Sequence, residues 1–186
     1  MPKIKELLKT QHGSHLYNLA TEESDQDTYE IYTWNFKIWR PKKQAEQTID
    51  EEDKLRISLD RFTSSVYKGV PQSLETLFSP QSKWIYWDVT WPQIQANLIR
   101  QLPKYKKQIV DTYLRKAEKL MRKDDPKKNR HAFRLLLNLG DFLDYGKMYP
   151  SLDGFSIQIL NRTIDNDYVK RCENFEKDVK LLRSGM

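Results

Sequence analysis

Cysteine is nearly absent from this chain of 186 residues, and its single Cys172 excludes an intramolecular disulfide. No group of cysteines and histidines has the spacing of a zinc site. The sequence lacks an apolar run of the about 20 residues that a membrane-spanning helix needs. Its charged N-terminus, MPKIKELLKTQ, has no apolar core of the kind found in signal peptides. We therefore expect a protein of the reducing cytoplasm, with no membrane partner.

Positive charge is concentrated in one region of the sequence. The chain has a net charge of +6, and residues 104–130 contain eleven Lys or Arg against four Asp or Glu, a balance of +7. That segment alone accounts for the positive excess. Two interpretations stay open: a solvated helix face, or a surface that binds a polyanion such as nucleic acid.

The periodicity of apolar residues changes once along the sequence, from strand-like to helical. In the first half we predict, in chain order, a strand or short helix over 5–11, a strand over 26–34, an exposed loop over 40–52, a strand over 54–59, and helices over 59–67 and 73–78. In the second half we predict helix over 92–146 and 164–183. The pattern favours an α+β fold, with a mixed sheet and flanking helices over 1–90 and a helical lobe over 91–186.

A Gly-Ser turn and two carboxylates lie close together in the sequence. Ten residues separate the Gly13-Ser14 pair from Asp25, and Asp27 follows two positions later. If residues 26–34 form a strand, the alternation of side chains projects both carboxylates the same way. Paired carboxylates suit Mg²⁺ or Mn²⁺, which bind hard oxygen ligands together with substrate phosphates. A Gly-Ser turn offers backbone N–H groups and a hydroxyl to a triphosphate.

Two residues beside these motifs have less specific roles. His15 follows the turn directly, and we predict that it either contacts phosphate or holds the turn in shape. Ser24 precedes the first carboxylate and is expected to cap or order the chain at that point. The aromatic cluster formed by Trp84, Trp87 and Trp91 is predicted to pack in the core or between domains rather than to stack on bases.

A long helix is predicted to begin near Pro126 and to stop at Gly146. Its apolar stripe has helical spacing and consists of Ala132, Leu135, Leu136, Leu139 and Leu143. Another face, at steps of four and three residues, carries Lys127, His131, Arg134, Asn138 and Asp141. For an isolated His-x-x-Arg pair such as His131 and Arg134, the residues alone favour a helix surface with a local hydrogen bond.

Three segments resemble, in this order, one protein family. GSHLYNLATEESDQDTYEIY (13–32) is similar to the Gly-Ser…Asp-x-Asp signature of the DNA polymerase beta-like nucleotidyltransferases, and most of all to the stand-alone branch associated with RNA repair. KGVPQSLETLFSP (68–80) and KKNRHAFRLLLNLGDFLDYGKMYPSL (127–152) resemble later segments of that branch. The chain departs from the branch at Asn18, where Gly is usual, and at Val70, where Asn is usual. Asn18 is a tolerable substitute because Asn adopts positive φ in turns.

The resemblance implies a nucleotidyltransferase core, followed by a helical lobe that closes the cleft. The implied reaction moves NMP from an NTP to a hydroxyl acceptor by two-metal in-line phosphoryl transfer. Asp25 and Asp27 would then be catalytic metal ligands, with Mg²⁺ or Mn²⁺ as the cofactor and NTP as the substrate. Gly13 and Ser14, with His15, would hold the triphosphate.

The resemblance also implies roles for residues farther along the chain. A third carboxylate is implied on the strand before the Leu-x-x-Phe helix, and Asp53 is the preferred residue for this metal ligand. The alternatives are Glu51, Glu52 and Asp60. His131 and Arg134 are implied to bind phosphate on a helix face directed at the cleft, whereas Glu75 is expected to make a structural hydrogen bond.

The acceptor is the least determined part of this interpretation. The basic segment 104–130 favours nucleic acid, either RNA or tRNA, over a small molecule. One alternative is a catalytically idle nucleic-acid-binding module of the same fold, although intact Asp25 and Asp27 argue against it. The other alternative is an enzyme that modifies a protein or a small molecule.

Overall fold

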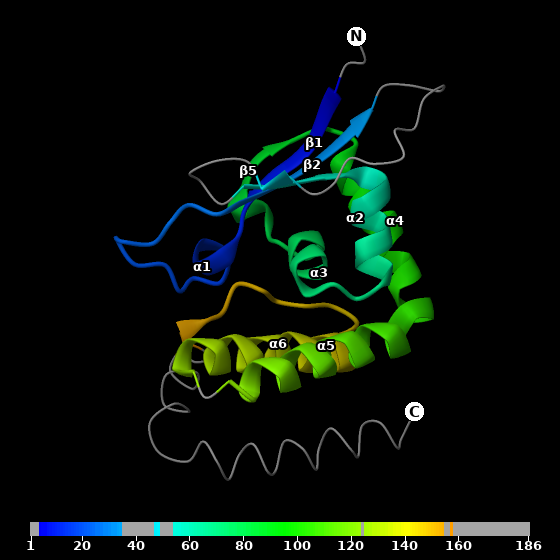
Figure 1. Ribbon diagram of the computed structural model, residues 1–186. Coiled ribbons are helices and arrows are strands. Elements are labelled where there is room, and N and C mark those ends of the chain that lie inside the picture. The colour runs from blue at the N-terminus through cyan, green and yellow to red at the C-terminus, as the bar shows by residue number, and fades with distance from the viewer. Residues whose placement is uncertain (1–3, 35–46, 49–53, 124, 155–156, 158–186) are drawn as a thin grey trace.

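A mixed five-stranded sheet forms one end of the molecule (Figure 1). The structure is a computed structural model that describes residues 4–34, 47–48, 54–123, 125–154 and 157. The strands are β1 (Ile4–Gln11), β2 (Thr28–Trp34), β3 (Gln47–Thr48), β4 (Lys54–Ser58) and β5 (Trp84–Trp87), in the spatial order β3-β4-β2-β1-β5. β2 and β4 are parallel, whereas the pairs β1–β2, β1–β5 and β3–β4 are antiparallel. The mixed sheet of the predicted α+β fold is confirmed.

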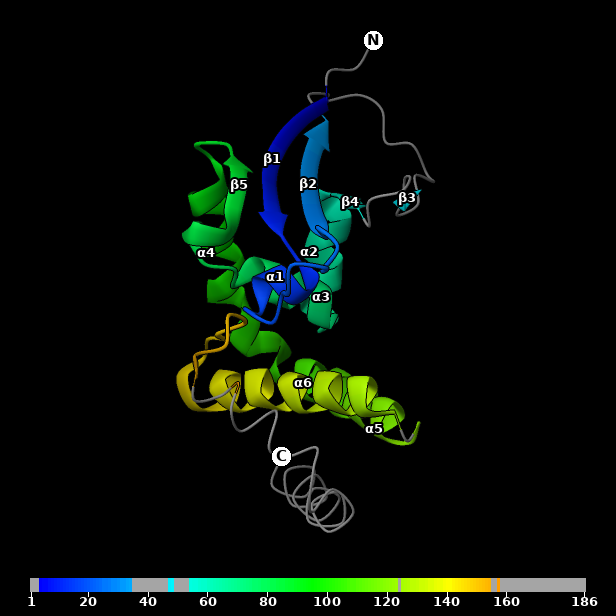
Figure 2. The ribbon, with the colours of Figure 1, turned by 90° about the vertical axis from the view of Figure 1, so that its left-hand side faces the viewer.

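Helices pack beside this sheet and extend beyond one end of it (Figures 1 and 2). They are α1 (Gly13–Leu16), α2 (Leu59–Tyr67), α3 (Pro71–Leu77), α4 (Trp91–Gln101), α5 (Lys106–Met121) and α6 (Pro126–Tyr145), with 3₁₀ turns η1 (Gln81–Lys83) and η2 (Leu102–Tyr105). The two ribbon views place α1 and α3 between the sheet and the paired helices α5 and α6 (Figures 1 and 2). None of the helices in the described part of the chain is both long enough and apolar enough to cross a membrane.

Several element boundaries follow the sequence prediction closely. The helix over 59–67 is confirmed as α2, and the strand over 54–59 is confirmed as β4, which is one residue shorter. The segment 5–11, left open between strand and helix, belongs to β1. The stretch predicted as helix over 92–146 is helical, although η2 and the turn after α5 interrupt it. The helix predicted over 164–183 lies outside the described residues.

Three expectations need correction. The short helix predicted over 73–78 begins instead at Pro71, because proline fits the first turn of a helix, where its missing N–H has no helical acceptor. Within the loop predicted over 40–52, residues 47–48 form β3 and pair with β4. Of the three tryptophans, only Trp91 is fully buried, whereas Trp87 on β5 is 41% exposed.

The start of β2 changes the argument for the two carboxylates. The strand begins at Thr28, so Asp25 and Asp27 both precede it instead of lying on one strand face. The predicted start of the strand at residue 26 is wrong, and strand alternation therefore does not determine how the two carboxylates are oriented relative to each other. The position of Asp27 is fixed by the adjoining turn, as described below.

One continuous hydrophobic core joins the two regions that the sequence suggested as separate domains. Phe62 of α2 packs between Tyr29 of β2 and Trp91 of α4, with ring centroids 6.0 and 5.9 Å apart. The same core includes buried side chains of α5 and α6. The predicted stripe of α6 is confirmed, since Ala132, Leu135 and Leu139 are buried and Leu136 and Leu143 pack against the core. The division at residue 90 stays a prediction.

Candidate functional site

The end of β1 brings the Gly-Ser turn against the residues that precede β2. Gln11 pairs with Thr28 at the end of the antiparallel ladder, and the next backbone N–H, that of His12, donates to the carbonyl of Asp27 at 2.9 Å. Gly13 then turns the chain with φ of +56°, a conformation that glycine adopts without steric cost. A Cβ on Gly13 would collide with Oδ2 of Asp27. The absence of a side chain at position 13 therefore lets the Asp27 carboxylate lie directly on the turn.

The loop from 17 to 27 is ordered by short polar side chains. Asn18 adopts φ of +59°, as its substitution for glycine in the resembling branch suggested. The hydroxyl of Ser24 accepts a hydrogen bond from the Thr21 N–H at 2.9 Å, so Ser24 orders this loop as predicted. Asp25 follows and is exposed, whereas Asp27 is half-buried against the turn. The two carboxylates thus have different surroundings at the same end of the sheet.

Of the four candidates for the third carboxylate, one lies among the described residues. Asp53, Glu51 and Glu52 lie outside the described residues, and the fourth candidate, Asp60, is exposed in the first turn of α2. β2 and β4 run in parallel with Thr28 opposite Lys54, so the starts of both strands lie side by side. Among the residues that the structure does describe, no three His, Cys, Asp or Glu side chains form a group able to hold a metal ion.

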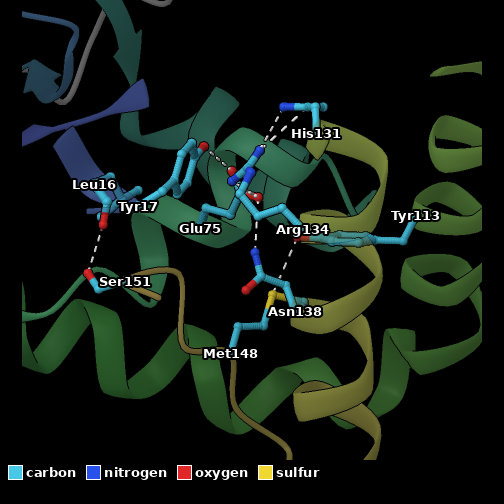
Figure 3. Close-up of polar contacts among 9 residues, drawn as sticks. All are labelled: Leu16, Tyr17, Glu75, Tyr113, His131, Arg134, Asn138, Met148 and Ser151. Carbon is cyan, nitrogen blue, oxygen red and sulfur yellow. Dashed lines mark hydrogen bonds and ion pairs between the residues drawn. The ribbon is translucent and has the colours of Figure 1, made fainter. Parts of the chain in front are cut away.

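A buried polar cluster lies behind the turn, centred on Glu75 of α3 (Figure 3). The carboxylate of Glu75 accepts hydrogen bonds from the Tyr17 hydroxyl at 2.6 Å, from the Arg134 guanidinium at 2.9 Å and from the Asn138 side-chain amide at 3.1 Å. Glu75 is completely buried, and Arg134 is 2% exposed. The guanidinium lies 3.4 Å from the centroid of the Tyr17 ring, in a cation–π arrangement. Glu75 therefore makes the structural contact that its resemblance implied.

The predicted phosphate-binding pair His131 and Arg134 is placed around this cluster. An Arg134 nitrogen lies 3.0 Å from Nδ1 of His131, one turn earlier on α6. This is the local hydrogen bond that the residues alone favoured, although it lies in the interior and not on an open helix surface. The Arg134 guanidinium is bound by Glu75 and by the ring of Tyr17. The pair therefore lies behind the Gly-Ser turn. The phosphate role of both residues stays a prediction.

The electrostatics of the cluster keep its imidazoles neutral. The pKa of His12 is lowered from 6.5 to about 4, mainly by burial; the Glu75 carboxylate opposes this shift and the Arg134 cation adds to it. Burial, followed by the Arg134 cation, likewise lowers the pKa of His131 to about 4. Burial together with the neighbouring Glu75 carboxylate raises the pKa of the Tyr17 hydroxyl, so Tyr17 is a hydrogen-bond donor throughout the physiological range. Any contact of these imidazoles with an anion near pH 7 would be through hydrogen bonds and not through charge.

Sequence reasoning did not identify the residues that connect the turn to the rest of the protein. These contacts are the hydrogen bonds from Tyr17 to Glu75, from Lys83 to the His15 carbonyl and from Ser151 to the Leu16 carbonyl. The sequence predicted none of them. The signal for Tyr17 was its place in the resembling segment, three residues after Ser14, whereas Ser151 was at the end of the third segment without a role.

A scan against protein-family models gave no match, and searches of curated proteins and of solved structures likewise gave none.

Proposed function

We propose that this protein is a Mg²⁺- or Mn²⁺-dependent nucleotidyltransferase related to the DNA polymerase beta-like superfamily, which moves NMP from an NTP to a hydroxyl acceptor. The observation that most supports the proposal is the contact between the Gly13 turn and the Asp27 carboxylate. Nucleotidyl transfer needs a phosphate-binding backbone and metal-binding carboxylates within a few ångströms of each other. The resemblance of residues 13–32 predicts that combination, and the fold brings its two halves into contact.

The residues at this end of the sheet fit a magnesium ion. Asp25 and Asp27 offer carboxylate oxygens, the donors that Mg²⁺ prefers, and Mg²⁺ commonly uses only one or two protein carboxylates beside substrate phosphates. The Asp27 carboxylate occupies the space that a side chain at position 13 would fill, so its Oδ2 lies against the backbone of the turn. In the proposal Asp53 supplies the third carboxylate from the residue before β4. When bound, the metal would neutralise phosphate charge and lower the pKa of the acceptor hydroxyl.

The protein's own contribution is to bind and orient the triphosphate. The first N–H groups of α1 have no acceptor within so short a helix, so the backbone around Gly13 and Ser14 can donate to phosphate oxygens. The Ser14 hydroxyl adds a donor that can be lost with a smaller effect, since the backbone donors remain. His12 and His15 flank the turn as further hydrogen-bonding groups, and His12 is neutral because burial lowers its pKa. This geometry binds an NTP without requiring a side-chain general base.

Exposed cations on and around α5 favour a nucleic-acid acceptor over a small molecule. The exposed members of the basic segment are Lys104, Lys106, Lys107, Arg115, Lys119, Arg122, Lys123, Lys127 and Arg130. Four of them, Lys106, Lys107, Arg115 and Lys119, belong to α5, whose buried residues include Ile109, Tyr113 and Ala117. A polyanion that contacts several of these cations releases counterions, so its affinity should fall steeply as salt is raised. We propose RNA, including tRNA, as the acceptor.

The function is tested by incubating the protein with each labelled NTP, Mg²⁺ or Mn²⁺, and total RNA, and resolving RNA and protein products separately. We expect metal-dependent label in RNA, and loss of that label for Asp25→Asn or Asp27→Asn, because each change removes a carboxylate that would bind the metal. Far-UV circular dichroism checks that these variants keep the fold. Full turnover in either variant would refute the metal site.

Other outcomes of the same experiment separate the alternatives. Label in protein and not in RNA would identify an enzyme that modifies a protein. RNA binding with steep salt dependence but no transfer with any NTP would identify the catalytically idle module. Binding of RNA that does not respond to salt would contradict the role of the basic segment and would leave α5 as a solvated helix face.

A further inference from the structure

The helix that follows the Gly-Ser turn is too short to hold its own shape. α1 has four residues, which is barely one turn, and its N-cap residue His12 makes no side-chain capping bond. A single helical turn is unstable alone because it fixes several backbone dihedrals for very few hydrogen bonds. Its last carbonyl groups also have no N–H donor within the helix, so other parts of the protein must donate hydrogen bonds to them. The geometry of the turn therefore depends on what surrounds α1.

Distant segments bind the carbonyl groups at the end of α1. Nζ of Lys83 donates to the His15 carbonyl at 2.7 Å, and the Ser151 hydroxyl donates to the Leu16 carbonyl at 2.8 Å. The Leu152 N–H donates to the Tyr17 carbonyl at 3.3 Å. The Asn18 side-chain amide returns a bond to the Leu152 carbonyl at 3.1 Å. Three successive carbonyls of this turn are thus bound by groups more than sixty residues away in the sequence.

The side chain of Tyr17 is held as firmly as its backbone. Its hydroxyl donates to Glu75 of α3, and its ring lies against the Arg134 guanidinium of α6 (Figure 3). The segment 148–152 that binds the Leu16 and Tyr17 carbonyls follows α6 directly, and it is fixed at its start by the Tyr113 hydroxyl, 3.3 Å from the sulfur of Met148. Residues of α3 and α6 and the segment after α6 therefore converge on Tyr17, three positions beyond Ser14, and α5 contributes through Met148.

We infer that Tyr17 is a positioning residue for nucleotide binding, and that the segment 148–152 with the Glu75–Arg134 pair holds it so that the Gly13-Ser14 turn keeps its binding geometry. The inference rests on the proposed function. A site that binds phosphate through backbone N–H groups must be held to within about 0.5 Å by the residues behind it. The helical half of the chain supplies that support from behind the turn, without contacting the nucleotide itself.

The test uses Ser151→Ala, with Ser79→Ala as the matched control. Each change removes a hydroxyl that donates to a backbone carbonyl at 2.8 Å. The Ser79 hydroxyl donates to Thr76 and also accepts from Nε1 of Trp84, and neither partner belongs to α1. Hydrogen exchange is followed at the Leu16, Tyr17 and Leu19 amides, which donate within the turn. For Ser151→Ala we expect exchange there to accelerate about fivefold, the effect of one net hydrogen bond, and the KM for NTP to rise by a similar factor with kcat within twofold.

Ser79→Ala should leave both the local exchange and the KM unchanged, whatever it does to global stability in urea. Tyr17→Phe, which keeps the ring against Arg134 but removes the hydroxyl from Glu75, should raise the KM in the same direction. If Ser151→Ala changes only global stability, as its control does, the inference is overturned. If wild-type protein binds no NTP with metal present, the proposed function fails together with the nucleotide role of Tyr17. The exchange data without nucleotide still decide whether the segment 148–152 orders α1.

Discussion

The two helices α1 and α6 are stabilised in opposite ways. α6 has twenty residues, and its ends are capped locally: the Asp125 carboxylate accepts from the Lys127 and Lys128 N–H groups, and Gly146 ends the helix with φ of +67°. α1 has four residues, no side-chain cap, and carbonyls bound by Lys83, Ser151 and Leu152. The long helix is specified by neighbours in sequence, whereas the short one is specified by the rest of the fold. The candidate site lies at the helix that depends on others.

The largest loss of stability is expected on changing Glu75 of α3, which binds both Tyr17 at the end of α1 and Arg134 of α6. Glu75→Gln leaves the buried Arg134 cation without its counter-charge, and breaking such a pair costs about 3–5 kcal/mol of unfolding free energy. The loss is measured by urea denaturation, with the exposed Glu23→Gln as the control, which should change stability by less than about 0.5 kcal/mol. Equal and small losses in both variants would mean that Arg134 does not depend on Glu75.

A pH effect of the next size is expected from the imidazole that precedes α1. The pKa of His12 is about 4 in the folded state against 6.5 when unfolded, so the unfolded chain binds the extra proton first. His12 therefore contributes full stability above about pH 6.5, which is lost as the pH falls toward 4, by at most about 3 kcal/mol.

The measurement compares unfolding free energies of the wild type and His12→Gln between pH 7 and pH 4. The difference between the two proteins isolates His12 from the carboxylates, which titrate in both. We expect the wild type to lose more stability than the variant over this range. Parallel curves would show that His12 is not buried in its neutral form.

Two glycines make the comparison between the helices sharper. Gly13→Ala places a Cβ against Asp27 and imposes a left-handed residue, which costs about 1–2 kcal/mol and should weaken NTP binding at least tenfold. Gly140→Ala in α6 meets no atom within 4 Å and should stabilise the protein by about 0.5–1 kcal/mol. Thermal unfolding and calorimetric NTP titration give both results. Undiminished NTP affinity in Gly13→Ala would place the triphosphate elsewhere.

The smallest effect is expected at the cap of α6. Asp125→Ala removes the acceptor of two backbone N–H groups and should cost about 1 kcal/mol, with no change in the exchange of the Leu16 and Tyr17 amides. Denaturation and hydrogen exchange measure the two parts. Faster exchange in α1 would show that the cap of α6 also acts on the turn, and the contrast between the helices would then be weaker than proposed.

This contrast explains which features could be predicted from the sequence. The stripe of α6 and its stop at Gly146 are local patterns, and so is the helix over 59–67; all three are confirmed. The ion pair of Glu75 with Arg134 joins residues 59 positions apart, and nothing local specifies it. The start of β2 at Thr28 was also missed, because the residues before it are shaped by the contact of Gly13 with Asp27 and not by strand propensity.

The contacts of Ser151 and Leu152 with α1 also impose an order in time. During synthesis the Gly13-Ser14 segment leaves the ribosome early, whereas the groups that bind the Leu16 and Tyr17 carbonyls are added about 135 residues later. The sheet pairing of β1 with β2 needs only neighbouring sequence and can form first. The turn therefore reaches its final geometry only after residue 152 has emerged, and a nascent or prematurely terminated chain has the Gly-Ser motif without the contacts that order α1.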